Sequence, residues 1–266
     1  MPKQKGVIKL TGTLQEISFY KREGEYLARE ASGPDRERIM KDPKFKRTRE
    51  NMSEFGGAAV LGKEFREGWT SLLQKVADSR MTSRVTGLMR KIIGGGRGPR
   101  GQRSFDLLTN KRHVEGFEFN RQQSLSAVFY APFGMPAADA NRSVVTWTVP
   151  DFRTDEEVKP PYGATHFQLV LASKVFGDFE YDAADAQYRA VEPDVMAHYG
   201  MAQSDLMPLG GAVGSDVVLS VDHSLAEALP AAAALVNAVG ILFYQEVDGV
   251  PYLLESDSAL KVLNVL

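Results

Sequence analysis

The chain has 266 residues, of which 43% are hydrophobic, and its 32 Lys and Arg against 34 Asp and Glu give a formal net charge of −2. This composition is typical of a globular protein with one large or two small domains and excludes a disordered chain. The absence of cysteine excludes disulfides, thiolate catalysis and Cys-based metal sites.

The first pattern along the chain predicts a β-hairpin. Ile17 and Phe19 alternate with Ser18 and Tyr20, as in a half-buried strand, and Tyr26-Leu27-Ala28-Arg29-Glu30 returns after a turn at Gly24. A lone hairpin is barely stable in water. We therefore expect it to pack on helices, to join a sheet formed by the C-terminal half, or to pair with a neighbouring subunit.

A basic region with helical periodicity follows. Asp42-Pro43 is a helix-start pair, and Gly56-Gly57 permits a stop or a bend. Apolar residues at helical spacing predict one helix over residues 58–77 and another over 81–92. The short link between the two favours an antiparallel pair.

Residues 94–103 contain five glycines and three arginines and predict a flexible connection. They are not a phosphate-binding P-loop, because the Gly-Lys-Ser/Thr ending is missing. An Arg/Gly segment can also bind single-stranded nucleic acid, but one short copy favours a linker.

Strand-like patterns dominate the remainder. Short runs of strand-forming residues predict strands over residues 116–119, 125–130, 144–149, 166–171, 178–182, 217–221, 239–247 and 250–254. Asp248-Gly249 predicts a hairpin turn between the last two. We predict an α+β chain with two domains. The first, residues 1–103, holds the β-hairpin, the basic helical region and the Gly/Arg-rich linker, and the second, residues 104–266, is an Ig-like antiparallel β-sandwich.

Charge is distributed unevenly. Residues 1–123 hold 26 Lys and Arg against 15 Asp and Glu, whereas residues 124–266 hold 6 against 19. Such a division favours nucleic-acid contact through one half or head-to-tail pairing of copies. Contact between the two halves inside one molecule is an equally good interpretation.

No residue pattern indicates catalysis. The four histidines lack the spacing of a metal site, and neither a Gly-x-Ser-x-Gly elbow nor a dinucleotide-binding glycine pattern occurs. Asp178, Glu180 and Asp182 could face a cation together, but a solvated acidic strand face is the better interpretation. We therefore expect no enzyme, no cofactor and no metal. An enzyme or ligand-binding role stays open without a pattern that supports it.

Four segments resemble a group of uncharacterised bacterial proteins of similar length. They are Phe19-Tyr20-Lys21, residues 26–30, residues 47–56 with the sequence RTRENMSEFG, and residues 243–250 with the sequence FYQEVDGV. The resemblance covers most of the chain. It implies no activity and therefore no catalytic residue.

Two functions follow from these patterns. The first is a self-assembling structural protein, a filament or tube subunit whose partner is itself. Its expected interface residues are Ile17, Phe19, Tyr20, Tyr26 and Leu27, with Arg47 and Arg49 facing Asp178 and Glu180. The alternative is a nucleic-acid-binding protein that uses Lys44, Lys46, Arg47, Arg49, Arg97, Arg100 and Arg103. The sequence has no signal-peptide pattern and no apolar run of ~20 residues, which predicts a protein without a membrane span that is cytoplasmic or is released without a cleaved signal.

Overall fold

The computed structural model describes residues 2–30 and 33–266, apart from the side chain of Ser256. The chain forms two compact units, Met1–Arg49 and Glu50–Leu266. The predicted domain boundary at 103/104 lies inside the second unit. The first unit holds 13 Lys and Arg against 7 Asp and Glu, and the second holds 19 against 27, so their formal charges are +6 and −8.

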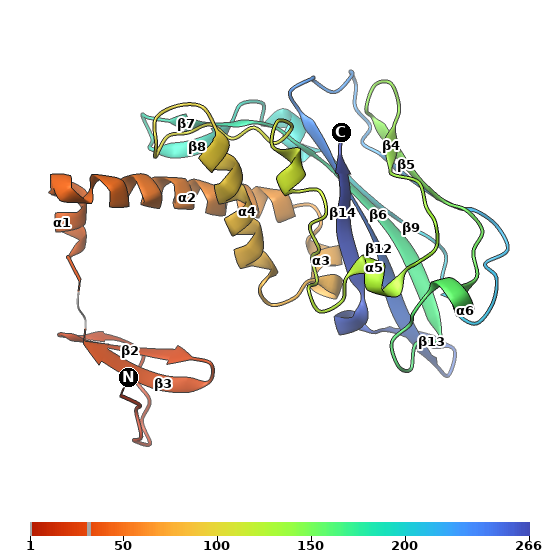
Figure 1. Cartoon of the computed structure of the whole chain (residues 1–266), viewed down its shortest axis with the longest axis horizontal. Coiled ribbons are helices and arrows are strands. Elements are labelled where there is room, and N and C mark those ends of the chain that lie inside the picture. The colour runs from red at the N-terminus through yellow and green to blue at the C-terminus, as the bar shows by residue number, and fades with distance from the viewer. Residues whose placement is uncertain (1, 31–32) are drawn as a thin grey trace. The chain divides into compact units, whose positions relative to one another are not determined.

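The N-terminal unit contains a three-stranded antiparallel sheet in the order β1-β2-β3 (Figure 1). Its strands are β1 (Gly12–Leu14), β2 (Ile17–Arg22) and β3 (Glu25–Glu30), followed by helix α1 (Arg36–Lys41) and the 3-10 turn η1 (Pro43–Phe45). The predicted hairpin is confirmed. Glu23 and Gly24 both have positive φ, 51° and 85°, as a tight two-residue turn requires.

Three helices follow, namely α2 (Lys46–Arg66), α3 (Thr70–Val76) and α4 (Met81–Gly95). The expected stop or bend at Gly56-Gly57 is wrong, because α2 continues through it. Gly57 serves a close approach instead: a Cβ there would lie 2.3 Å from the ring of Tyr188. The single helix predicted over residues 58–77 is broken after Arg66, where Gly68 takes a φ of +89°.

A buried lysine closes the C-terminal end of α2. Lys174 is 3% exposed, and its Nζ donates hydrogen bonds to the carbonyl oxygens of Glu64 and Glu67, the latter at 2.7 Å. These carbonyls belong to the end of a helix, where backbone acceptors lack partners within the helix and a positive charge is favoured. Burial lowers the pKa of Lys174 to about 8, against the opposing effect of the Glu64 and Glu67 carboxylates.

A six-stranded antiparallel sheet forms the centre of the second unit. Its strands are β6 (His166–Phe176), β9 (Tyr199–Gln203), β10 (Met207–Pro208), β12 (Ala234–Val247), β13 (Val250–Leu253) and β14 (Ala259–Val265). β12 pairs with β6 along one edge and with β14 and β13 along the other. The turn predicted at Asp248-Gly249 is confirmed between β12 and β13.

Both faces of this sheet are covered (Figure 1). One face packs against α2, α3 and α4, through a core that includes Phe65, Trp69 and Phe176. The other packs against a second small sheet through a core that includes Trp147 and Phe243. The small sheet has the order β11-β5-β4, from strands β4 (Ala137–Ala138), β5 (Val144–Val149) and β11 (Val217–Asp222).

The remaining elements are short. They are β7 (Phe179–Asp182) and β8 (Gln187–Ala190), which form a hairpin, helices α5 (Leu125–Val128) and α6 (Thr154–Glu157), and the 3-10 turns η2 (Lys111–His113), η3 (Asp194–Ala197) and η4 (Glu255–Asp257). The strand predicted over residues 125–130 is therefore wrong, because α5 occupies most of it. Residues 116–119 form only an isolated bridge, between Glu118 and Lys261.

The C-terminal strand is bonded along both edges. β14 pairs with β12 on one side, and on the other Gly116 N and Phe119 N donate to Val262 O and Leu260 O at 2.8 and 2.9 Å. The backbone of Leu266 exchanges two hydrogen bonds with Leu235. This end of the chain thus completes its own sheet.

The chain is an α+β protein whose sheets are antiparallel, as predicted at that level. Within the described residues, no helix combines the length and the apolar character that crossing a membrane would require.

Candidate functional site

The N-terminal sheet presents an apolar face that its own unit leaves open. In the strand register Leu14 pairs with Ile17, and Phe19 pairs with Ala28, so these four side chains share one face. We call them the N-terminal apolar face. Leu14 and Ile17 are 64% and 47% exposed. Among the described residues of Met1–Arg49, Leu27 alone counts as a buried hydrophobic side chain.

The five predicted hairpin residues lie on both faces of this sheet. Ile17, Phe19 and Tyr26 share the face just defined, whereas Tyr20 and Leu27 pair with each other on the opposite face. A cationic side chain lies near each of the two tyrosine rings; Lys21 Nζ, for example, lies 5.4 Å from the centre of the Tyr26 ring. Leu27 is 7% exposed. The five residues therefore do not form one contact surface.

The two outer edges of the N-terminal sheet differ. Along β3, Gln4 N donates to Tyr26 O and Ala28 N donates to Pro2 O, both at 2.9 Å. Along β1 the sheet ends, because β2 is the one strand that pairs with β1 within the described chain. β1 thus offers an open edge beside the N-terminal apolar face.

The two predicted interface arginines have different surroundings. Arg49 Nη1 donates to Ile39 O at 2.6 Å and to Asp42 O at 2.9 Å, which ties the end of α1 to the first turn of α2. Arg47 is exposed on the same turn. Arg49 therefore already serves a contact inside its own unit.

Asp178 and Glu180 line an acidic pocket of about 320 Å³, together with Asp106, Glu192 and Arg97. Burial raises the pKa of Asp178 to about 6, and the nearby carboxylates of Asp106, Glu192 and Glu180 add to the effect. The pocket contains one arginine but is acidic overall. Across the part of the chain that the structure describes, no group of three or more His, Asp or Glu is arranged to hold a metal ion.

The Gly/Arg-rich segment is held in place, although we predicted a flexible connection. Arg103 forms two hydrogen bonds with the Glu54 carboxylate, at 2.8 and 2.9 Å, and Gly101 N donates to the same carboxylate at 2.8 Å. Ser53 Oγ donates to Gly101 O at 2.6 Å, and Arg100 donates to Asn51 at 2.8 Å.

The prediction of a flexible connection over residues 94–103 did not take Glu54 into account, although this residue anchors the segment. It is 3% exposed and lies on the buried stripe of α2 that also contains Ala58 and Leu61. Burial raises its pKa, but the hydrogen bonds from Arg103 and Gly101 outweigh burial and hold the pKa of Glu54 below its ordinary value. An acid on an apolar stripe predicts a cationic partner, and that pattern could have identified the contact.

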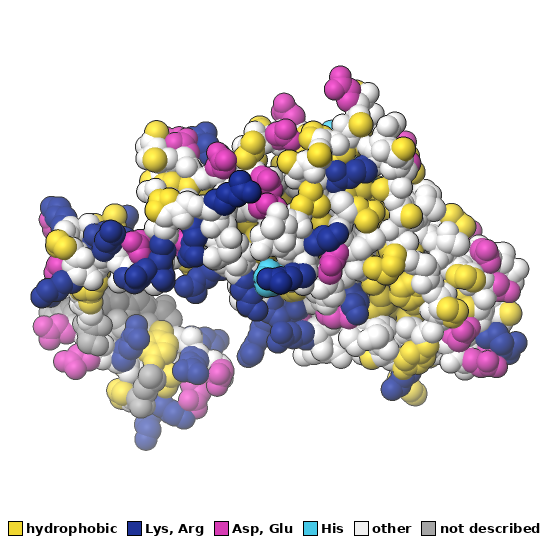
Figure 2. Space-filling view, turned by 45° about the horizontal axis from the view of Figure 1, so that its top comes forward, with side chains coloured by type: hydrophobic (Ala, Val, Ile, Leu, Met, Phe, Trp, Pro, Cys, Tyr) yellow, Lys and Arg dark blue, Asp and Glu magenta, His cyan; other side chains and the backbone are white. Residues whose placement is uncertain are grey.

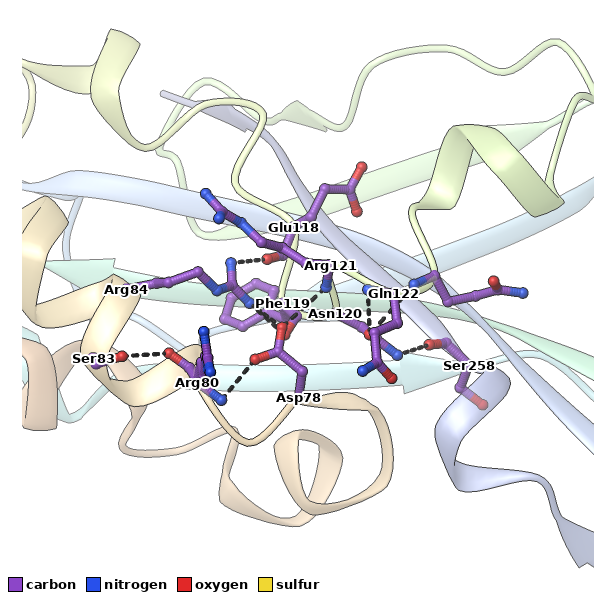
Figure 3. Close-up of polar contacts among 11 residues, drawn as sticks. Asp78, Arg80, Ser83, Arg84, Glu118, Phe119, Asn120, Arg121, Gln122 and Ser258 are labelled. Atoms are coloured by element: carbon purple, nitrogen blue, oxygen red, sulfur yellow. Dashed lines mark hydrogen bonds and ion pairs between the residues drawn. The ribbon is translucent and has the colours of Figure 1, made fainter. Parts of the chain in front are cut away.

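A second polar cluster joins the α3–α4 link to residues 118–122 (Figure 3). The Asp78 carboxylate accepts hydrogen bonds from Arg80 N, Arg121 N and Arg84 Nη2, at 2.8, 3.0 and 2.5 Å. Arg84 also donates to Glu118 O at 2.6 Å and Phe119 O at 2.9 Å. Burial opposes the charged form, yet these donors hold the pKa of Asp78 below its ordinary value. The cluster fixes both segments.

A buried serine and a buried histidine lie within hydrogen-bond distance of each other in the second unit, on the face of the central sheet that the small sheet covers. Ser173 Oγ is 2.9 Å from His223 Nε2 and donates to Asn237 Oδ1 at 2.7 Å. Because the single hydroxyl proton goes to Asn237, His223 must donate to Ser173 and does not act as its base. Ser173 is 0% exposed and His223 5%. Burial lowers the pKa of His223, which favours the neutral imidazole. The cluster is a packed polar core and not a nucleophilic pair.

Comparison of the chain with protein-family models, with curated proteins and with solved structures finds no match. The resemblance to bacterial proteins of similar length therefore stays an expectation.

Proposed function

We propose that the protein is a self-assembling structural protein whose copies join through the N-terminal sheet. One observation carries this proposal: the described part of Met1–Arg49 buries only Leu27 among its hydrophobic side chains. A segment of this size without a core cannot offset the entropy of ordering its backbone. Contact with another copy would supply the missing apolar burial.

The geometry of the N-terminal sheet suits such a contact. Its apolar face and the open edge of β1 lie together, and an open edge can accept a strand from another chain. The C-terminal strand is not part of the proposal, because both of its edges are bonded within its own chain. We therefore place the strand-mediated contact at the N-terminal sheet alone.

Charge favours contact between unlike parts of two copies. The N-terminal unit carries +6 and the remainder −8, and the acidic pocket around Asp178 and Glu180 offers a target for exposed cations such as Lys44 and Lys46. A contact between two different surfaces of identical subunits generates rings or open filaments. Such charge attraction weakens as salt screens it.

Sedimentation velocity and negative-stain microscopy over a concentration series, at low and high salt, test the proposal. Wild type is expected to form larger species at low salt. Leu14→Lys/Ile17→Lys, which places two charges on the N-terminal apolar face, is expected to stay monomeric. Val218→Lys is the matched control, because Val218 is also an exposed strand residue, 56% exposed, on β11. A wild type that is monomeric at every concentration and salt would contradict the proposal.

Nucleic-acid binding is the weaker candidate. Of the seven expected contact residues, Arg49, Arg100 and Arg103 are already used within the chain, while Lys44, Lys46 and Arg97 are exposed. Binding through phosphates would weaken steeply with salt. A gel shift with DNA or RNA that disappears as salt rises would favour this function, and no shift at low salt would remove it.

The sheets of the second unit also suggest a more specific proposal about the fold. The small sheet β11-β5-β4 packs face to face on the central sheet through Trp147, as the layers of an Ig-like sandwich do. We propose that these two sheets form the predicted sandwich, with the helices added to its outer face. The order of strands in an experimental structure of the body would test it.

A further inference from the structure

A groove lies between α4 and the segment 116–124. Its volume is about 540 Å³. The α4 side is formed by residues at helical spacing, and the opposite side by residues of the segment; the groove residues are Arg84, Gly87, Leu88, Lys91, Gly116, Phe117, Glu118, Arg121 and Ser124. All of them belong to the second compact unit.

Two of the three cations of the groove lack a charged partner within the described residues. Lys91 and Arg121 form no side-chain hydrogen bond or ion pair with the described residues, whereas Arg84 is paired with Asp78 at 2.5 Å. Glu118, the one acid of the groove, is itself committed: its carboxylate lies 3.3 Å from Leu125 N and 3.5 Å from Lys261 Nζ. Figure 3 shows the Glu118 carboxylate directed away from the Arg84 and Arg121 guanidinium groups.

Figure 2 shows Lys and Arg side chains gathered in the middle of the face that it draws. Both cations line the same groove, and an anion bound there would be attracted by both of them.

The walls of the groove are rigid and partly apolar. Residues 116–119 are bonded to β14, and Arg84 holds Glu118 O and Phe119 O. Leu88 and Phe117 pack on the helix-side core and supply an apolar surface, and the Arg84 guanidinium lies 4.9 Å from the centre of the Phe117 ring. An apolar wall with a few fixed polar groups is the usual make-up of a small-molecule site.

We infer that this groove binds a small organic anion with an aromatic ring. The ring would lie on Leu88 and Phe117, and the anionic group would lie between Lys91 and Arg121, within reach of the Ser124 hydroxyl. Gly87 leaves space for the ligand, because an added Cβ there would meet no atom within 4 Å and the groove is open above it. Binding at this groove does not require self-assembly.

Phenyl phosphate is a suitable probe. Its binding is measured through the amide chemical shifts of the isotope-labelled full chain. We expect saturable shifts at residues 84–91 and 116–124 with a Kd on the order of a millimolar for a ligand of this size. Phenol and inorganic phosphate, which each lack one half of the recognised chemistry, are expected to bind at least several-fold more weakly. Affinity is expected to fall with salt.

Three variants decide the assignment. Lys91→Ala/Arg121→Ala should weaken phenyl phosphate by roughly tenfold or more, because charged hydrogen bonds are lost. Arg90→Ala, on the same helix but outside the groove, is the matched control and should bind as wild type does. Gly87→Gln should abolish the saturable shifts while the melting temperature is kept. No saturable shift in wild type, equal binding of inorganic phosphate, or an equal loss in Arg90→Ala would overturn the inference.

Discussion

The two compact units differ in what they bury. Glu50–Leu266 encloses Phe65, Trp69 and Trp147 at 1% exposure or less, whereas the described part of Met1–Arg49 encloses Leu27 alone. Their ion pairs differ in the same way. The side chains of Lys3 and Glu25 are 57% and 52% exposed, but those of Arg103 and Glu54 are 23% and 4% exposed. The second unit thus has a buried core of its own, whereas the described part of the N-terminal unit has almost none.

The largest effect should come from the aromatic core. Trp69→Ala is expected to lower the free energy of unfolding by about 3–5 kcal/mol, because it leaves a large cavity. Ile17→Ala, at a position 47% exposed, should stay within ~0.5 kcal/mol of wild type in dilute monomer. Urea denaturation measures both. A large cost for Ile17→Ala in the monomer would break the comparison, since Ile17 would then be buried against the same chain.

The ion pairs should show the next largest difference. Arg103→Ala leaves the Glu54 carboxylate buried without its partner and is expected to cost about 3 kcal/mol. Lys3→Ala removes an exposed pair and should cost less than ~1 kcal/mol. Equal costs in chemical denaturation would mean that burial does not separate the two units in the way described.

Two neighbouring glycines of α2 sharpen the comparison on one helix. Gly57→Ala is expected to destabilise by about 1–3 kcal/mol, because its Cβ would meet the Tyr188 ring at 2.3 Å. Gly56→Ala is the control, since its Cβ meets nothing within 4 Å, and it should stabilise by about 0.5–1 kcal/mol through helix propensity. Thermal unfolding of the two variants should shift in opposite directions, and a shift of both in one direction would be evidence against the close approach.

The smallest effect concerns pH. The pKa of Asp178 is about 6 in the folded protein, above the value of ~4 in an unfolded chain. Between these two pH values the folded state therefore binds one more proton than the unfolded state. The favourable contribution of Asp178 to folding stability is present below pH ~4 and is lost as the pH rises through ~6. Asp178→Asn should stabilise by about 1 kcal/mol at pH 7 and by nothing at pH 4. Glu180→Gln, on strand β7 in the same pocket, removes one of the carboxylates that raise this pKa and should therefore give a dependence of the same sign but smaller size.

Local features of the fold could be predicted from the sequence, because they depend on neighbouring residues. The hairpin turn at Glu23-Gly24, the start at Asp42-Pro43 and the turn at Asp248-Gly249 each follow from conformational preferences of two residues. The α+β class followed from the change of periodicity along the chain.

Long-range features could not be predicted in this way. Phe167 and Leu169 alternate with His166 and Gln168 in the sequence, as in a half-buried strand. Residues 169–176 are nevertheless buried throughout, because helices cover the second face. The pairing of β14 with residues 116–119 joins segments more than 100 residues apart. Nothing in one strand specifies which partner it finds.

The candidate sites show the same difference between local features, which the sequence predicts, and long-range features, which it does not. Ile17 and Phe19 were placed correctly on one strand face by alternation, but the opposite placement of Tyr20 and Leu27 follows from the same alternation and argues against a single patch. The α4 groove needs residues from α4 and from the segment 116–124 together. No spacing within either segment indicates it.

The anchoring of the Gly/Arg-rich segment has a consequence for proteolysis. Trypsin cuts after arginine, and glycine-rich segments are ordinarily its first targets because they fit the protease in an extended form. Here Arg103 is held by Glu54, and the backbone of Arg97 and Ser104 is paired at 2.8 Å. Cleavage would require this segment to detach from α2 first. Limited digestion of the native protein should therefore leave the chain intact between Gly94 and Ser104, while Arg103→Ala should be cut there early.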